Sequence, residues 1–140
     1  MSGLVWAKMH GAVVHFPVAL SLCSAALDAA GFVRPTRPVA RELHRAGRFA
    51  LVAGTLGSAG AVISGLLMTK GEWLGHGLLR WHHAFAWPAF GLLVGLSAWR
   101  VLAGAQPPRR ALGCYLVCAW LAAGLVAATG YWGGDLLIRS

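Results

Sequence analysis

The sequence predicts an all-α fold, an integral membrane four-helix bundle with up-down-up-down topology. The chain of 140 residues is 58% hydrophobic and only 11% charged, and its mean hydropathy is +0.65. A soluble domain of this size cannot bury that much apolar surface. Four apolar segments, each near the ~20 residues that a helix needs to cross a bilayer, are separated by short links, which favour antiparallel neighbours.

The four segments are taken in chain order, and together they make residues 1–140 a single transmembrane domain. The predicted spans cover about residues 11–33, 49–68, 81–102 and 111–132. The first link is rich in arginine and is interrupted by Pro35 and Pro38, the second is mixed, and the third contains two prolines. The sequence shows no basic leader with a small-residue cleavage site, so we expect the first span itself to anchor the chain.

Basic residues are distributed unevenly between the two ends of the predicted bundle. The net charge of +8 accompanies no soluble core with a basic stripe, so nucleic acid is not the expected partner. Eight basic residues fall at the end with the first and third links, and four at the other end (Arg34, Arg37, Arg41, Arg45, Arg48, Arg100, Arg109, Arg110; Lys8, Lys70, Arg80, Arg139). The positive-inside rule then places both termini in the periplasm of a bacterium, with the bundle in the inner membrane.

Alternating helix direction brings most of the histidines to one end. Five of the six histidines converge at the predicted outer face (His10, His15, His76, His82, His83). Ionisable residues at membrane depth are costly and are therefore candidates for function. The sixth, His44, lies among arginines at the other end, where we expect it to be solvated.

Helix geometry narrows the possible ligands. At about 100° per residue, His10 and His15 lie roughly 140° apart around the first helix, and His82 and His83 about 100° apart on the third. One histidine of each pair can therefore face a common centre. Two histidines on facing helices can bind a haem iron from both sides, and His15 with His83 is the favoured pair because both lie deeper. The absence of a C-x-x-C-H motif excludes covalent attachment, so the predicted cofactor is haem b.

Other residues have structural as well as functional readings. Pro17 and Pro88 follow these histidines and each can kink its helix or free a carbonyl that orients a ligand. The glycines of the second span favour close helix packing, although they also leave room for a flat cofactor. The three cysteines (Cys23, Cys114, Cys118) are expected to be small buried hydrophobes.

Two acidic residues are expected to form ion pairs. Asp28 is expected to pair with an arginine of the first link, and Asp135 with Arg139 or Arg80. Neither lies mid-membrane, where a coupling carboxylate would indicate transport.

The chain resembles a known family at both ends. Residues 10–20 read HGAVVHFPVAL, which is similar to the opening H-P-x-x-V-H-F-P-I-A-L of a family of four-helix bacterial membrane proteins known as domain of unknown function 2231. Residues 130–137, GYWGGDLL, resemble that family's G-x-x-G-G-x-L-V close, and His83-Ala84 also fits its pattern. Gly11 replaces the family's proline, so we expect the first helix to start earlier here. The resemblance implies the fold and the helix count.

The leading functional hypothesis is a haem b-binding membrane subunit that relays electrons between a periplasmic redox partner and the quinone pool. No acid–base pair or nucleophile set is visible, so an electron-transfer subunit is expected rather than a stand-alone enzyme. The alternative is a cofactor-free membrane anchor or assembly subunit of a larger redox or photosynthetic complex, whose partners are lipid and other protein subunits.

Two further sites remain open. In a pigment-binding subunit, one histidine would suffice to ligate the magnesium of a chlorophyll. A metal site at the outer surface would combine His10, His76, His82 and Asp135.

Overall fold

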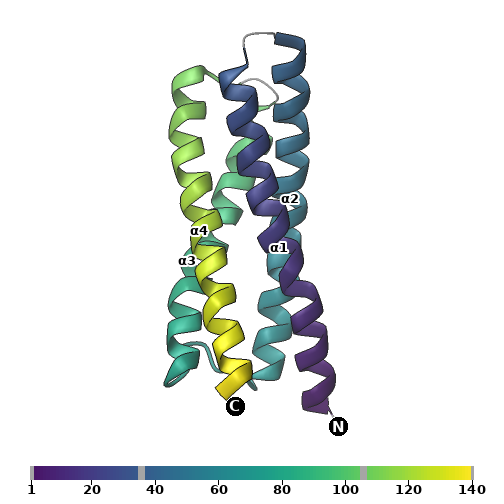
Figure 1. Cartoon of the computed structure of the whole chain (residues 1–140), viewed down its shortest axis with the longest axis vertical. Helices are drawn as coiled ribbons and strands as arrows, with labels where there is room; N and C mark the ends of the chain where they lie inside the picture. Colours follow the sequence, from purple (N-terminus) through teal and green to yellow (C-terminus); the bar gives the residue numbers. More distant parts are fainter. Residues whose placement is uncertain (1, 35–36, 105–106, 140) are drawn as a thin grey trace.

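Four long helices make up the computed structural model, which describes residues 2–34, 37–104 and 107–139. The helices are α1 (Ser2–Val33), α2 (Arg37–Met68), α3 (Leu78–Ala103) and α4 (Arg109–Arg139). They run up and down in turn, so that both ends of the chain lie beside the α2–α3 link (Figure 1). All four are long and apolar enough to cross a membrane. The predicted all-α membrane bundle is confirmed.

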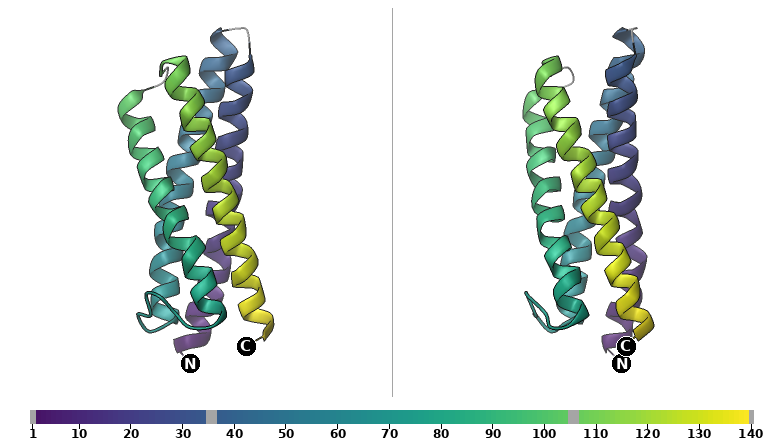
Figure 2. Two further views of the ribbon diagram at one scale, coloured as in Figure 1. Left: turned by 90° about the vertical axis from the view of Figure 1, so that its left-hand side faces the viewer. Right: turned by 60° about the vertical axis from the view of Figure 1, so that its left-hand side comes forward.

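The helices form a ring of neighbours in the order α1, α2, α3, α4. Helix α1 packs against α2 and α4, and helix α3 packs against the same two. The views in Figure 2 show the α1–α2 pair and the α3–α4 pair as two antiparallel hairpins side by side. Helices α1 and α3, which carry the candidate histidines, therefore lie diagonally opposite each other.

The helices extend beyond the apolar segments. Helix α1 begins at Ser2, as the missing proline at position 11 predicts. Helix α2 begins at Arg37, inside the segment predicted to be a link, because Pro38 lies in the first turn, where a proline costs no helical hydrogen bond. Pro17 and Pro88 both lie inside helices that continue through them.

The interior of the bundle contains small and polar side chains, while large apolar ones cover the outside. Buried apolar residues include Ala25, Leu93 and Ala122, whereas Phe16, Leu56 and Val117 are among many large apolar residues that are more than half exposed. Lipid is as apolar as these side chains, so exposure to it costs nothing. The distribution is that of a membrane protein in contact with lipid.

Glycines of α2 allow α1 to approach closely. A Cβ atom on Gly54 would lie 3.1 Å from Leu20 Cβ, and one on Gly57 would lie 3.3 Å from Pro17 Cδ. The packing role predicted for these glycines is confirmed.

The prediction that all three cysteines are buried is wrong. Cys23 and Cys114 are exposed and Cys118 is half-buried. They lie on outward faces of α1 and α4, where a small apolar side chain is equally well accommodated by lipid.

Candidate functional site

A cavity of about 330 Å³ opens among the four helices at the end of the bundle that holds both termini. Its walls are mainly apolar, and all four histidines of the predicted set line it (His10, His15, His82, His83). We call this cavity the histidine pocket.

His10 on α1 has one ring nitrogen engaged. Its Nδ1 lies 3.0 Å from Ser64 Oγ, and Ser64 Oγ donates to the Ala61 carbonyl at 3.0 Å. A hydroxyl has a single proton to donate, so Nδ1–H of His10 donates to Ser64. The neutral ring therefore has its lone pair on Nε2.

His82 on α3 has the same arrangement. Its Nδ1 lies 3.0 Å from the Thr129 carbonyl oxygen, which can only accept a hydrogen bond. Nδ1–H of His82 therefore donates, and the lone pair lies on Nε2. Gly133 gives the ring its room, because a Cβ there would lie 3.2 Å from Nδ1.

The two rings approach each other in an edge-to-face arrangement between α1 and α3. Their centroids are 6.5 Å apart, and their planes make an angle of 68°. A metal lies about 2 Å from a ligating imidazole nitrogen, which places the centroids of two imidazoles across one ion roughly 6 Å apart. The separation of His10 and His82 therefore suits two ligands of a single ion, each held by a hydrogen bond from its other nitrogen.

The other two candidate histidines are placed differently. His83 is buried, its ring centroid is 5.7 Å from that of His82, and its Nδ1 has no hydrogen-bond partner among the residues that the structure describes. His15 is exposed at the edge of the pocket. The structure brings together the other member of each pair, His10 and His82, whose rings are in contact and are each held by a hydrogen bond to a different residue.

The outer-surface metal site considered from the sequence is not assembled. The His76 side chain is 95% exposed and lies 3.9 Å from Glu72 Oε1. Within the described residues, no group of three or more histidine, cysteine or acidic side chains could hold a metal ion. Of the partners expected for Asp135, the Arg139 side chain lies outside the described part of the chain.

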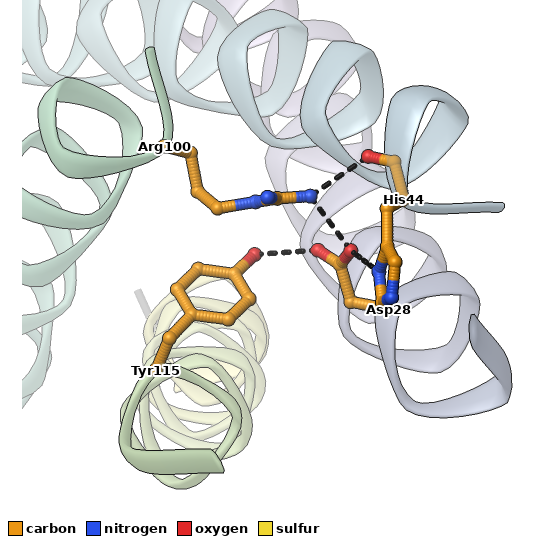
Figure 3. Close-up of polar contacts among 4 residues, drawn as sticks. All are labelled: Asp28, His44, Arg100 and Tyr115. Carbon is orange, nitrogen blue, oxygen red and sulfur yellow. Dashed lines mark hydrogen bonds and ion pairs between the residues drawn. The ribbon is translucent and has the colours of Figure 1, made fainter. Parts of the chain in front are cut away.

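A second polar site lies at the opposite end and takes one residue from each helix: Asp28, His44, Arg100 and Tyr115 (Figure 3). We call these four residues the polar cluster. All four are buried, and Asp28 and Arg100 are fully so.

Asp28 lies at the centre of the polar cluster. His44 Nδ1–H donates to Asp28 Oδ1 at 2.7 Å, Arg100 Nη2 to the same oxygen at 2.8 Å and Tyr115 O–H to Oδ2 at 2.8 Å. Arg100 Nη2 also donates to the His44 carbonyl at 2.7 Å. Two glycines make room, because a Cβ on Gly47 would lie 2.9 Å from Asp28 Cγ, and one on Gly31 would lie 2.7 Å from His44 Cε1.

Two predictions are therefore wrong. His44 is not solvated among arginines, because it turns inward and bonds to Asp28. Asp28 pairs with Arg100 of α3, not with an arginine of the first link. From the sequence, Arg100 was counted only among the basic residues of the arginine-rich end, and Tyr115 was assigned no role. The available signal was that Asp28 and Arg100 lie near the C-terminal ends of the first and third spans, which run in the same direction and so end on the same side, where a buried charge requires a partner.

Comparison with known proteins identifies the family of the chain only. No curated protein and no solved structure matches the chain significantly. Residues 7–140 match the family described as "Predicted membrane protein (DUF2231)", and this match includes both the histidines of the pocket and the residues of the polar cluster. The chain therefore belongs to the DUF2231 family of membrane proteins, as its opening and closing motifs indicate.

Proposed function

We propose that the chain is a haem b-binding membrane subunit that relays electrons, in which His10 and His82 would hold the haem iron. The observation that carries the proposal is the state of these two side chains. Each uses Nδ1–H in a hydrogen bond and keeps a lone pair on Nε2, as metal-ligating histidines do when a hydrogen bond from the other ring nitrogen fixes their orientation.

The pocket suits a flat, apolar group. Its volume of about 330 Å³ falls in the usual range for ligand sites, and such sites are typically apolar with a few placed polar groups. The two histidines come from diagonal helices, so a ring between them would be enclosed by all four. Gly65 and Gly133 have no side chains to push the histidine rings away from this position, since a Cβ on Gly65 would lie 3.1 Å from His10 Cε1.

Haem would supply reversible one-electron chemistry. The chain's own residues would hold the haem and control its surroundings. Ser64 and the Thr129 carbonyl would fix the orientation of the ligating rings, and the apolar walls would exclude water, which tunes the reduction potential. The buried His83 lies beside His82 and would form part of the wall, whereas His15 would lie at its edge.

The proposed orientation determines which partners could exchange electrons with the pocket. The arginine-rich links favour the cytoplasm, which puts the histidine pocket at the outer face of a bacterial inner membrane. An electron donor or acceptor in the periplasm could then approach the pocket from outside, while a quinone could reach it through the bilayer.

The test is a dithionite-reduced minus oxidised visible spectrum of protein expressed with added haem, together with a pyridine haemochrome determination. We expect b-type α and Soret bands, lost in His10→Ala and His82→Ala. His76→Ala is the matched control, because that histidine lies at the same end but is exposed. A featureless wild-type spectrum would refute the proposal.

A cofactor-free anchor is the second candidate, and one observation favours it. The bonds of His10 to Ser64 and of His82 to Thr129 each join two helices, and polar side chains hold membrane helices together in this way. Under this reading the two substitutions would reduce bundle stability and leave no spectral change to observe, because no haem would be present.

A further inference from the structure

The bundle consists of two hairpins, α1–α2 and α3–α4, and hydrogen bonds between the hairpins gather at the polar cluster. Arg100 and Tyr115 belong to the second hairpin, and both donate to Asp28 of the first. Arg100 also donates to the His44 carbonyl. Figure 3 shows the bonds of Arg100 and Tyr115 to the Asp28 carboxylate and the bond of Arg100 to the His44 carbonyl oxygen.

Further crossing bonds lie between the polar cluster and the middle of the bundle. Thr55 on α2 forms a hydrogen bond with Ser97 Oγ on α3 at 2.7 Å, and its Oγ1 also lies 3.2 Å from the Leu93 carbonyl oxygen. These contacts connect the two hairpins beyond the polar cluster, in the direction of the histidine pocket.

At the histidine pocket, the hydrogen bonds of His10 and His82 each stay within a hairpin. His10 donates to Ser64 across α1 and α2, and His82 donates to the Thr129 carbonyl across α3 and α4. Between the hairpins at this end lies the cavity of about 330 Å³, where contacts between apolar side chains are already reduced.

We propose that the polar cluster is a fixed hinge, and that the hairpins separate at the histidine pocket to admit a flat apolar ligand from the bilayer. Separation at the cluster would expose Asp28 and Arg100 to lipid, which is strongly unfavourable. Separation at the pocket replaces apolar contacts by equally apolar lipid. The hinge does not depend on the proposed function. Only the identification of the ligand as haem rests on the proposed function.

The experiment measures distances between spin labels at each end of the haem-free protein in lipid nanodiscs. Cys23, Cys114 and Cys118 are first replaced by serine. One label pair, Met9→Cys with Tyr131→Cys, spans the hairpins at the pocket end, and a second, Val33→Cys with Arg110→Cys, spans them at the cluster end. We expect a broad distribution reaching longer distances at the pocket end and a narrow one at the cluster end.

Addition of haem then separates the two proposals. If the hinge and the haem site are both correct, haem shifts the pocket-end distribution to a single short distance and leaves the cluster end unchanged. A broad distance distribution at the pocket end and a narrow one at the cluster end, with no response to haem, would support the hinge and count against haem as its ligand. Equally narrow or equally broad distributions at the two ends of the haem-free protein would overturn the hinge.

Because a variant of the cluster could fail to fold, the label pairs leave the four residues of the cluster intact. Asp28→Asn adds a second measurement, and we expect it to broaden the distribution at the cluster end. Glu42→Gln, which changes an exposed carboxylate on α2, is the matched control. A cluster-end distribution unchanged by Asp28→Asn would contradict the assignment of the cluster as the hinge.

Discussion

His82 illustrates how one hydrogen bond prepares a side chain for a role. The Thr129 carbonyl accepts from Nδ1, which leaves Nε2 as the lone-pair nitrogen, and Gly133 leaves the ring its space. His10 reaches the same state through Ser64. Gly133 is the second glycine of the family's closing motif, and a side chain at this position would displace the His82 ring.

Gly133→Ala tests that reason. Its Cβ would lie 3.2 Å from His82 Nδ1, tighter than ordinary contact, so we expect the ring to shift and the haem content per protein to fall. Gly134→Ala is the matched control, because a Cβ there meets nothing within 4 Å. Equal haem content in the two variants would show that Gly133 does not position His82.

Asp28→Leu tests the energetics of the polar cluster. The substitution leaves the Arg100 guanidinium buried and without its carboxylate, and breaking a buried pair in this way typically costs about 3–5 kcal/mol. The free energy of unfolding, measured by SDS titration in mixed micelles, should fall by this amount, whereas the exposed Glu42→Gln should leave it nearly unchanged. A cost equal to that of Glu42→Gln would mean that the pair contributes no stability.

At the scale of elements, α1 and α2 pack closely because glycine recurs along α2. We expect Gly54→Val to force the helices apart, since its Cβ alone would lie 3.1 Å from Leu20 Cβ. Overpacking of this kind costs about 1–3 kcal/mol. Gly91→Val on α3, where a Cβ meets nothing within 4 Å, is the control, and the two are compared by the same SDS titration. Similar stabilities would argue against close packing of α1 on α2.

The helices could be predicted from sequence because hydropathy depends only on local composition. The convergence of His10, His82 and His83 followed from alternating helix direction alone. Helix direction did not show which histidine of each pair would meet the other helix's histidine. That depends on the rotation of each helix about its axis, which is set by packing, here at Gly65 and Gly133. The inward turn of His44 also escaped prediction, since its partner Asp28 is on another helix and the surrounding arginines suggest solvent.

At the scale of the whole molecule, the bundle has two chemically different ends. The end with the α1–α2 and α3–α4 links carries exposed arginines such as Arg41 and Arg45 and the polar cluster. The other end carries the histidine pocket and stacked tryptophans, Trp73 on Trp87 and Trp81 on Trp132. Tryptophan favours the membrane interface and arginine the cytoplasmic side.

Labelling of single cysteines tests the proposed orientation, in which the histidine pocket lies at the outer face of the membrane. In a background without native cysteines, His76→Cys should react with a membrane-impermeant maleimide in intact cells, because it lies in the exposed α2–α3 link. Glu42→Cys, on the arginine-rich end, should react only after the cells are permeabilised. The reverse pattern would place the histidine pocket at the cytoplasmic face.

The electron paramagnetic resonance spectrum of the ferric protein tests the central claim most directly, because it reports the ligands of the iron itself. If His10 and His82 bind the two faces of a haem, the spectrum will show a low-spin ferric signal with two imidazole ligands. His10→Ala or His82→Ala will then convert it to a high-spin signal or abolish haem binding, while His76→Ala will not change it. A high-spin wild-type signal, a low-spin signal that survives both substitutions, or no haem signal at all would contradict the claim.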